Sequence, residues 1–236
     1  MLHDPARHEA LCPLPWDEAR ARDLITHIAR DTEARFSEER YWPLHPLDRE
    51  DEDERSPPET PLYHGAAGVI WALHYLEGVG AVTLSRDQLA GIDRLLADNR
   101  TWLGAFFTQE RGAYLLGDTP ILMLALDAAP GEEREAELAA LIADSAAHPA
   151  RELMCGAPGA LLAALFLHER TGKARWAELF RRTAARLWGE LQWSTGRQCA
   201  YLTQDLRGKR STYLDAVHGF VGAAVPLIRG RRLLDP

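Results

Sequence analysis

The segment "MCGAPGALLAALFL", residues 154–167, is apolar over nearly its whole length and opens with two glycines, Gly156 and Gly159. A helix that is apolar almost all round must be buried on most of its sides. Two glycines one turn apart leave one face of the first turn without side chains, so a backbone or a ligand can approach it closely. The segment therefore predicts a short, buried helix with a crowded N-terminus.

This pattern recurs along the chain, which indicates a weak internal repeat. The related segments are "YHGAAGVIWALHYL" (63–76), "LLGDTPILMLAL" (115–126) and "VHGFVGAAVPLI" (217–228). The first and last keep both glycines, whereas the middle one has Gly117 followed by Pro120 at the second position. Pro226 in the last segment predicts a kink or an end of that helix.

Longer, charged segments with amphipathic periodicity alternate with the apolar ones, at 17–36, 85–107, 132–148 and 173–193. Ser85 and Gln88 have the spacing of a capping box, which predicts a helix start at Ser85. Strand patterns are scarce, and "QCAYLTQ" (198–204) is the one candidate. The sequence thus predicts an all-α fold of helical hairpins, with the short helices in an inner layer and the long ones in an outer layer.

The prolines and acidic residues of 43–61 disfavour both helix and strand. We interpret this segment as a solvated loop inside a single domain spanning 1–236, with an acidic docking segment as the alternative.

Bulk composition narrows the classes of function. The formal net charge of −8 disfavours nucleic-acid binding, which needs a basic face. The longest apolar stretches are too short to cross a bilayer, and the first residues lack the pattern of a secretion signal. Cys12, Cys155 and Cys199 are widely spaced and odd in number, which does not predict a disulfide framework. We expect a cytoplasmic protein without a membrane span.

The glycine-marked segments resemble those of the lanthionine synthetase C-like proteins. "RELMCGAPGALLAALFLHERTG" (151–172) is similar to the third repeat of that family, and "YLDAVHGFVGA" (213–223) to the fourth. The resemblance implies an α/α toroid, of which this chain would supply about four of seven hairpins as an incomplete, truncated ring. It runs from about residue 60 onward.

The activity that the resemblance implies is thioether formation in peptide modification. A cysteine thiol of a precursor peptide adds to a dehydrated serine or threonine, and a zinc ion held by two cysteines and a histidine lowers the thiol pKa. The family's zinc ligands lie in repeats that this sequence does not contain. We therefore expect no metal ligands and no cofactor in this chain, and no activity from it alone.

Two residues are the candidate catalytic site. His218 matches the fourth-repeat histidine of the family, which implies acid/base or enolate-stabilising chemistry; an imidazole suits either role because it titrates near neutrality. Glu152 matches an acidic position of the third repeat and could orient His218 or share its proton. A structural histidine and a carboxylate at a helix N-terminus are the alternatives.

Other polar residues near the glycines have simpler interpretations. Cys155 occupies a position that mimics a family zinc ligand, but a small buried thiol fits it better. His64 is interpreted as structural, and Asp118 as a helix cap. Asp215 stands where the family usually has glycine and adds a carboxylate near His218.

Two further functions stay open. One is a non-catalytic domain that binds peptides on the concave face of the arc. The other is an α/α-toroid carbohydrate enzyme, for which Glu152 and Asp215 are the candidate acids. For partners, we expect a peptide substrate, further hairpins or a second copy of the chain, because an uncapped end of a repeat array exposes apolar surface.

Overall fold

The computed structural model describes residues 15–45, 57–107 and 110–234, and they are mostly helical. In chain order, the elements are α1 (Glu18–Ala34), α2 (Ala66–Gly78), α3 (Ile92–Phe106), α4 (Thr119–Ala128), α5 (Glu132–Ala146), α6 (Ala157–Thr171), α7 (Ala174–Gly189), β1 (Gln192–Ser194), β2 (Cys199–Tyr201), β3 (Gln204–Leu206), β4 (Lys209–Ser211), α8 (Phe220–Arg229) and the short 3₁₀ helix η3 (Arg231–Leu233). Most of the 43–61 loop and Cys12 lie outside the described residues.

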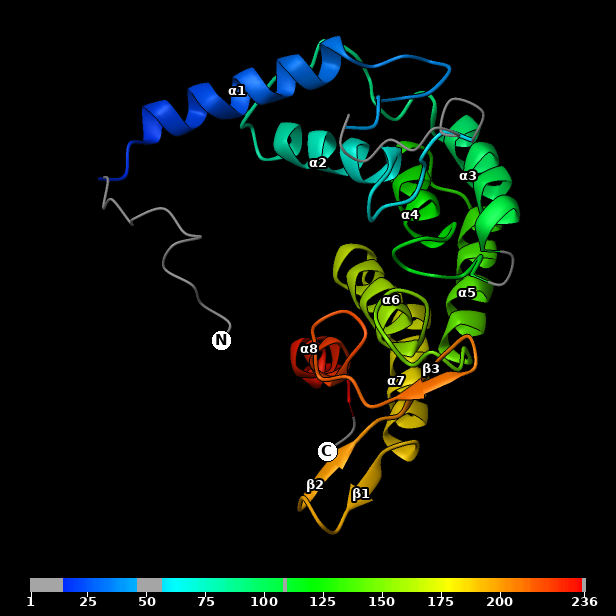
Figure 1. The fold of residues 1–236 in the computed structure, drawn as a ribbon. Helices are drawn as coiled ribbons and strands as arrows, with labels where there is room; N and C mark the ends of the chain where they lie inside the picture. The colour runs from blue at the N-terminus through cyan, green and yellow to red at the C-terminus, as the bar shows by residue number, and fades with distance from the viewer. Residues whose placement is uncertain (1–14, 46–56, 108–109, 235–236) are drawn as a thin grey trace.

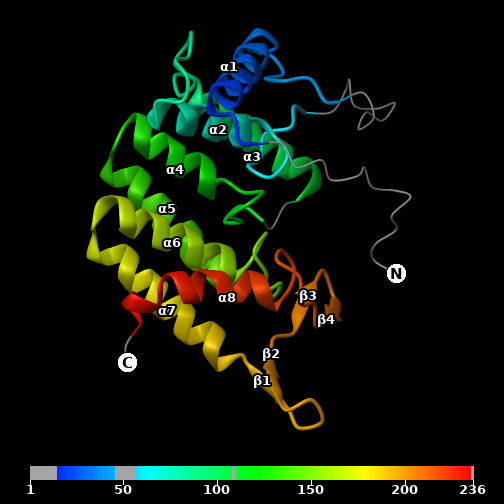
Figure 2. The same cartoon turned by 90° about the vertical axis from the view of Figure 1, so that its left-hand side faces the viewer.

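The helices form a curved double layer (Figure 1). The apolar helices α2, α4, α6 and α8 lie on the concave side, and α3, α5 and α7 lie behind them (Figures 1 and 2). α6 packs on α5, α7 and α8, and α4 packs on α3 and α5. The predicted helical character of the chain is confirmed, but α6, with 15 residues, is as long as α3 and α5, so the predicted difference in helix length does not hold for it.

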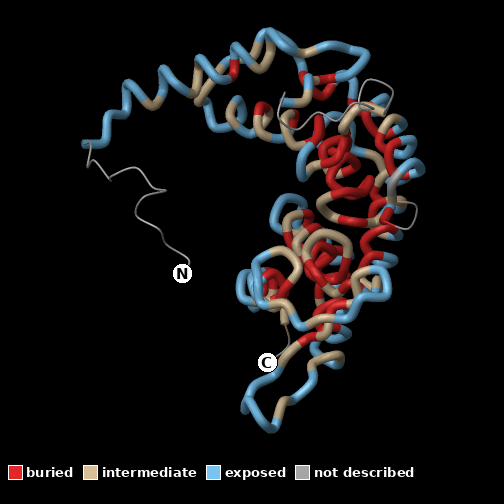
Figure 3. Tube along the Cα trace, viewed as in Figure 1, coloured by how far each residue is buried: buried red, intermediate tan, exposed pale blue. Residues whose placement is uncertain are grey.

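The hydrophobic core runs between the two layers, and buried residues concentrate along α4 to α7 (Figure 3). Leu122 and Leu161 from the inner helices belong to the same buried cluster as Trp176 and Phe180 of α7, and all four are at most 1% exposed. α7 is buried along one stripe only, as its charged outer face requires. α1 is the exception among the amphipathic helices, because its apolar Leu24 and Ile28 remain exposed.

The loops that precede the inner helices lie side by side and are joined by backbone hydrogen bonds. The amide of Tyr63 donates to the carbonyl of Leu115 at 3.0 Å, and the amide of Leu115 donates to that of Met154 at 3.2 Å. The amide of Leu153 donates to the carbonyl of Val217 at 2.8 Å. Each glycine-marked loop therefore contacts the next, and the N-termini of the inner helices gather at one end of the double layer.

The paired glycines are needed because each inner helix turns back on its own loop. A Cβ on Gly68, Gly159 or Gly222 would lie only 2.3, 2.4 or 2.7 Å from the carbonyl oxygen six residues earlier. The group that approaches these glycines is thus backbone of the same repeat. The motif explains the architecture without requiring a ligand.

Two predictions of helix boundaries are wrong. α3 begins at Ile92 instead of Ser85, since the amide and hydroxyl of Ser85 donate to Glu33 of α1 at 2.9 and 3.0 Å. The supposed capping box thus ties α1 to the loop before α3. Of the two outcomes expected at Pro226, a kink or an end of the helix, the end is wrong, since α8 continues to Arg229 with Pro226 buried.

The chain has more strand than the sequence predicted. Two antiparallel hairpins, β1–β2 and β3–β4, connect α7 to α8. The candidate segment 198–204 covers β2 and the first residue of β3 but misses β1 and β4. Each strand has three residues, too short for alternation to be visible.

Within the described ranges, none of the helices combines the length and apolar character needed to cross a membrane.

Candidate functional site

Glu152 lies in the loop before α6, and its side chain is completely buried. Its Oε2 accepts a hydrogen bond from the amide of Met154 at 2.9 Å, and its Oε1 accepts one from the amide of Cys155 at 2.7 Å. A buried carboxylate needs such donors, because desolvating an unpaired charge is costly. The carboxylate thus caps the turn that leads into α6.

His218 lies in the neighbouring loop, before α8, and its Nδ1 is 3.1 Å from Oε2 of Glu152. The backbone bond between Leu153 and Val217 holds the two loops at this spacing. The structure therefore brings the two predicted site residues together, although 66 positions separate them in the chain.

The contact fixes the ring of His218. With Nδ1–H donating to the carboxylate, Nε2 is the acceptor of the neutral imidazole, and in the imidazolium it becomes a donor. The side chain as a whole is 41% exposed, so part of the ring is open to solvent or a ligand. The pair can hold a proton at Nε2 and pass it on, which is the chemistry of a general acid or base.

Asp215 repeats the local role of Glu152 in the next repeat. Each carboxylate stands four residues before the first glycine, and Oδ1 of Asp215 accepts from the amides of Val217 and His218 at 2.8 and 2.7 Å. These backbone donors, that of His218 first, hold the pKa of Asp215 below its usual value. Asp215 therefore shapes the loop that carries His218.

The same contacts disfavour the carbohydrate-enzyme interpretation. Both carboxylate oxygens of Glu152, and Oδ1 of Asp215, accept hydrogen bonds from backbone amides two and three residues later. A glycosidase general acid needs a raised pKa, so Asp215, whose pKa is lowered, does not suit that role.

Cys155 is a partly buried, free thiol whose amide donates to Glu152. Burial raises its pKa well above the usual value, and the negative charges of Glu152 and Glu110 raise it further. This environment keeps the sulfur protonated, whereas a metal ligand or nucleophile must be a thiolate. In residues 15–45, 57–107 and 110–234, no three His, Cys, Asp or Glu side chains gather as a metal-binding group. The described residues therefore do not fit the family's zinc ion.

His64 precedes Gly65 as His218 precedes Gly219, but its surroundings differ. Its Nδ1 is 3.1 Å from Oε2 of Glu59, in the same loop, and its ring packs edge-on against Trp102 with centroids 5.7 Å apart. These contacts within its own hairpin and on the adjacent α3 agree with a structural role.

Asp118 corrects a prediction. It is the N-cap of α4, but its side chain makes no capping hydrogen bond. The buried carboxylate accepts instead from Asn99 at 3.0 Å and from both Arg100 and Arg111 at 2.9 Å. Both guanidinium groups also donate to Glu137 at 2.7 Å. Asp118 thus joins α3, α4 and α5 as the centre of an ion-pair network, a role that local sequence could not reveal.

Sequence analysis missed the contribution of the β3–β4 hairpin. Arg207 at its turn lies 3.4 Å from Glu110, and its guanidinium stacks on the ring of Phe107 at 4.6 Å. It also opposes the effect of the two acids on the pKa of Cys155. Gly208, at a φ of 83°, with its amide bonded to Asp205, is the turn signal that could have located this hairpin.

Neither a family model nor a curated protein matches this chain. The site is therefore interpreted from its own geometry and from the resemblance of its motifs.

Proposed function

We propose that the curved double layer is part of an α/α ring of the lanthionine synthetase C-like type, in which Glu152 and His218 handle the proton of thioether formation. The 3.1 Å contact between them carries the proposal. A buried carboxylate orients the ring, and the His218 side chain is 41% exposed.

The chemical step assigned to the pair is protonation at carbon. A thiolate sulfur forms a bond to the β-carbon of a dehydroalanine or dehydrobutyrine residue, and the double-bond electrons move to form an enolate. His218 delivers a proton from Nε2 to the α-carbon and regains one from solvent. Zinc supplies the thiolate in the family, and because the described residues do not fit it, the proposal leaves thiol activation outside this part of the chain.

The test bypasses thiol activation. An aromatic thiol that is ionised at neutral pH is added to a short peptide of L-residues containing dehydroalanine, and the two diastereomeric products are separated by chromatography. We expect the wild-type chain to favour one diastereomer, because a fixed imidazole protonates one face of the enolate. His218→Gln should abolish the excess, and His64→Gln is the matched control that should retain it. Equal amounts of both products with the wild type would contradict the proposal.

The exposed face of α8 supports the interpretation as part of a larger ring. Val221, Val225 and Ile228 form a stripe along this helix and are 48%, 50% and 64% exposed. Such a stripe is unusual for a repeat helix unless another one covers it. We propose that a further helical hairpin, from the same chain or a second copy, packs there.

A non-catalytic peptide-binding domain is the second candidate. Trp71 and Tyr75 stack on each other along the inner helix α2, with centroids 5.7 Å apart, and both are more than half exposed. Exposed stacked aromatics are typical of binding surfaces. If this function holds, Trp71→Ala weakens peptide binding measured by fluorescence anisotropy while His218→Gln leaves it unchanged. The reverse pattern would favour the catalytic proposal.

A further inference from the structure

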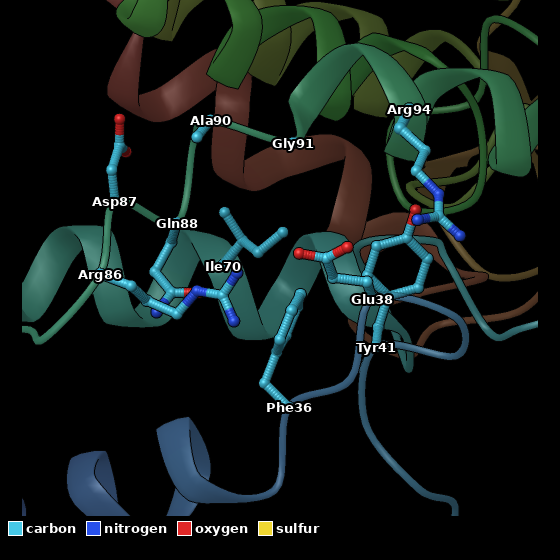
Figure 4. Close-up of a pocket in the computed structure, with 10 residues that line it drawn as sticks. All are labelled: Phe36, Glu38, Tyr41, Ile70, Arg86, Asp87, Gln88, Ala90, Gly91 and Arg94. Atoms are coloured by element: carbon cyan, nitrogen blue, oxygen red, sulfur yellow. The ribbon is translucent and has the colours of Figure 1, made fainter.

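A pocket of about 260 Å³ lies far from the glycine-marked loops of α6 and α8, where the turn after α1 meets α2 and the start of α3 (Figure 4). Phe36 and Ile70 give it apolar walls, and six polar residues line it: Glu38, Tyr41, Arg86, Asp87, Gln88 and Arg94. Its size is near the lower end of small-molecule sites.

The turn that carries Glu38 is closed on itself. Ser37 and Tyr41 exchange backbone hydrogen bonds of 2.7 and 2.9 Å, and the hydroxyl of Tyr41 donates to Asp98 of α3 at 2.7 Å. Tyr41 has a φ of 62°, a left-handed conformation that is unfavourable for a bulky residue. Backbone strain of this kind persists where the surrounding structure enforces it and is common at functional sites. Glu38 is therefore presented by a rigid turn.

Two opposite charges at this pocket have no ionic partner. The guanidinium of Arg86 lies over the ring of Phe36, 3.9 Å from its centroid, and neither Arg86 nor Glu38 forms an ion pair with a described residue. Figure 4 shows the two side chains reaching toward the same space from opposite sides. Arg94, by contrast, lies 3.5 Å from Asp98, and Asp87 points away from the pocket.

We propose that this pocket binds a small zwitterion, an amino acid with an apolar side chain. Its carboxylate would pair with Arg86, its ammonium group with Glu38, and its side chain would cover Ile70 and Phe36. The carboxylate of Glu38 would repel a simple anion, and the guanidinium of Arg86 would repel a simple cation. A molecule carrying both charges satisfies both groups, and charge-assisted hydrogen bonds are the strong ones. This inference is independent of the proposed function.

Titration calorimetry with leucine tests the proposal, together with leucinamide, which lacks the carboxylate, and 4-methylpentanoate, which lacks the ammonium group. We expect leucine to bind at least about tenfold more tightly than either analogue, because each analogue lacks one charge-assisted hydrogen bond and such a bond changes the affinity by about that factor. Arg86→Gln should weaken binding of leucine and 4-methylpentanoate. Glu38→Gln should weaken binding of leucine and leucinamide only.

Both substituted residues are exposed, so the variants should keep the wild-type fold. The matched controls are Glu39→Gln, on the same turn but outside the pocket lining, and Arg182→Gln, an exposed arginine of α7. Both should bind leucine as the wild type does. Absence of leucine binding at millimolar concentration, or equal binding by the Glu38 and Arg86 variants and the controls, would overturn the proposal.

Discussion

α6 and α8 open with the same glycine spacing, but their surroundings differ. In α6, Leu161 and Leu165 are at most 2% exposed, because α5, α7 and α8 surround the helix. In α8, Val225 and Ile228 are at least half exposed although they are equally apolar. The glycine motif therefore determines how a helix contacts its own loop, whereas the neighbouring hairpins determine whether the helix is buried.

The largest loss of stability should follow a substitution of Gly159, the second glycine of the enclosed helix α6. A Cβ in Gly159→Ala would lie 2.4 Å from a backbone oxygen and 2.7 Å from Cβ of Tyr114, so two packed groups must move. We expect a loss of about 3 kcal/mol in the free energy of unfolding. Gly222→Ala in α8 meets one backbone oxygen at 2.7 Å and should lose about 1 kcal/mol.

Urea denaturation of the two variants measures this difference. Equal losses of unfolding free energy in the two variants would show that the contact with the loop determines the loss, and that the enclosure of the helix does not. In that case the different surroundings of α6 and α8 would have no consequence for the stability of the fold.

The next largest loss of stability distinguishes Glu152 from Asp215, the two acids that cap the loops before α6 and α8. In Glu152→Gln, the single side-chain oxygen can serve only one of the two amides, and the new NH₂ group faces the other donor. We expect a loss of about 2 kcal/mol, the cost of one unsatisfied buried group. Asp215 accepts both of its amides on one oxygen, so an asparagine oxygen can replace it. Thermal unfolding should therefore show a much lower Tm for Glu152→Gln than for Asp215→Asn.

The sequence predicted those features whose cause is local or recurrent. Helix alternation follows from periodicity, and the glycine pairs located α2, α6 and α8, while Gly117 with Pro120 located α4. The contact between Glu152 and His218 was expected only because of the resemblance, since no local pattern encodes a contact between residues 66 positions apart. Local rules failed where a distant group competes: Glu33 binds Ser85, and Arg100 and Arg111 bind Asp118. The pocket beside Phe36 depends on three segments meeting and had no sequence signal.

The exposed stripe of α8 should cause copies of the chain to associate in solution. Val225→Asp places a charge at its centre, and burying that charge against another helix is unfavourable. We expect about a tenfold weaker association than for the wild type in sedimentation velocity, with unfolding stability changed by less than about 0.5 kcal/mol. Trp188→Asp is the control, because Trp188 is 70% exposed on the outer helix α7. A wild type that stays monomeric at all concentrations would contradict this use of the stripe.

The smallest effect concerns the pH dependence of Asp215. Its pKa is lowered in the folded chain, so the carboxylate stabilises the fold. That contribution is fully present above the unfolded value of about 3.9 and disappears as the pH falls through the lower folded value. Asp215→Asn cannot titrate, so a small Tm difference from the wild type at neutral pH should vanish in strong acid. A difference that persists there would mean that the loop before α8 depends on the shape of the side chain and not on its charge.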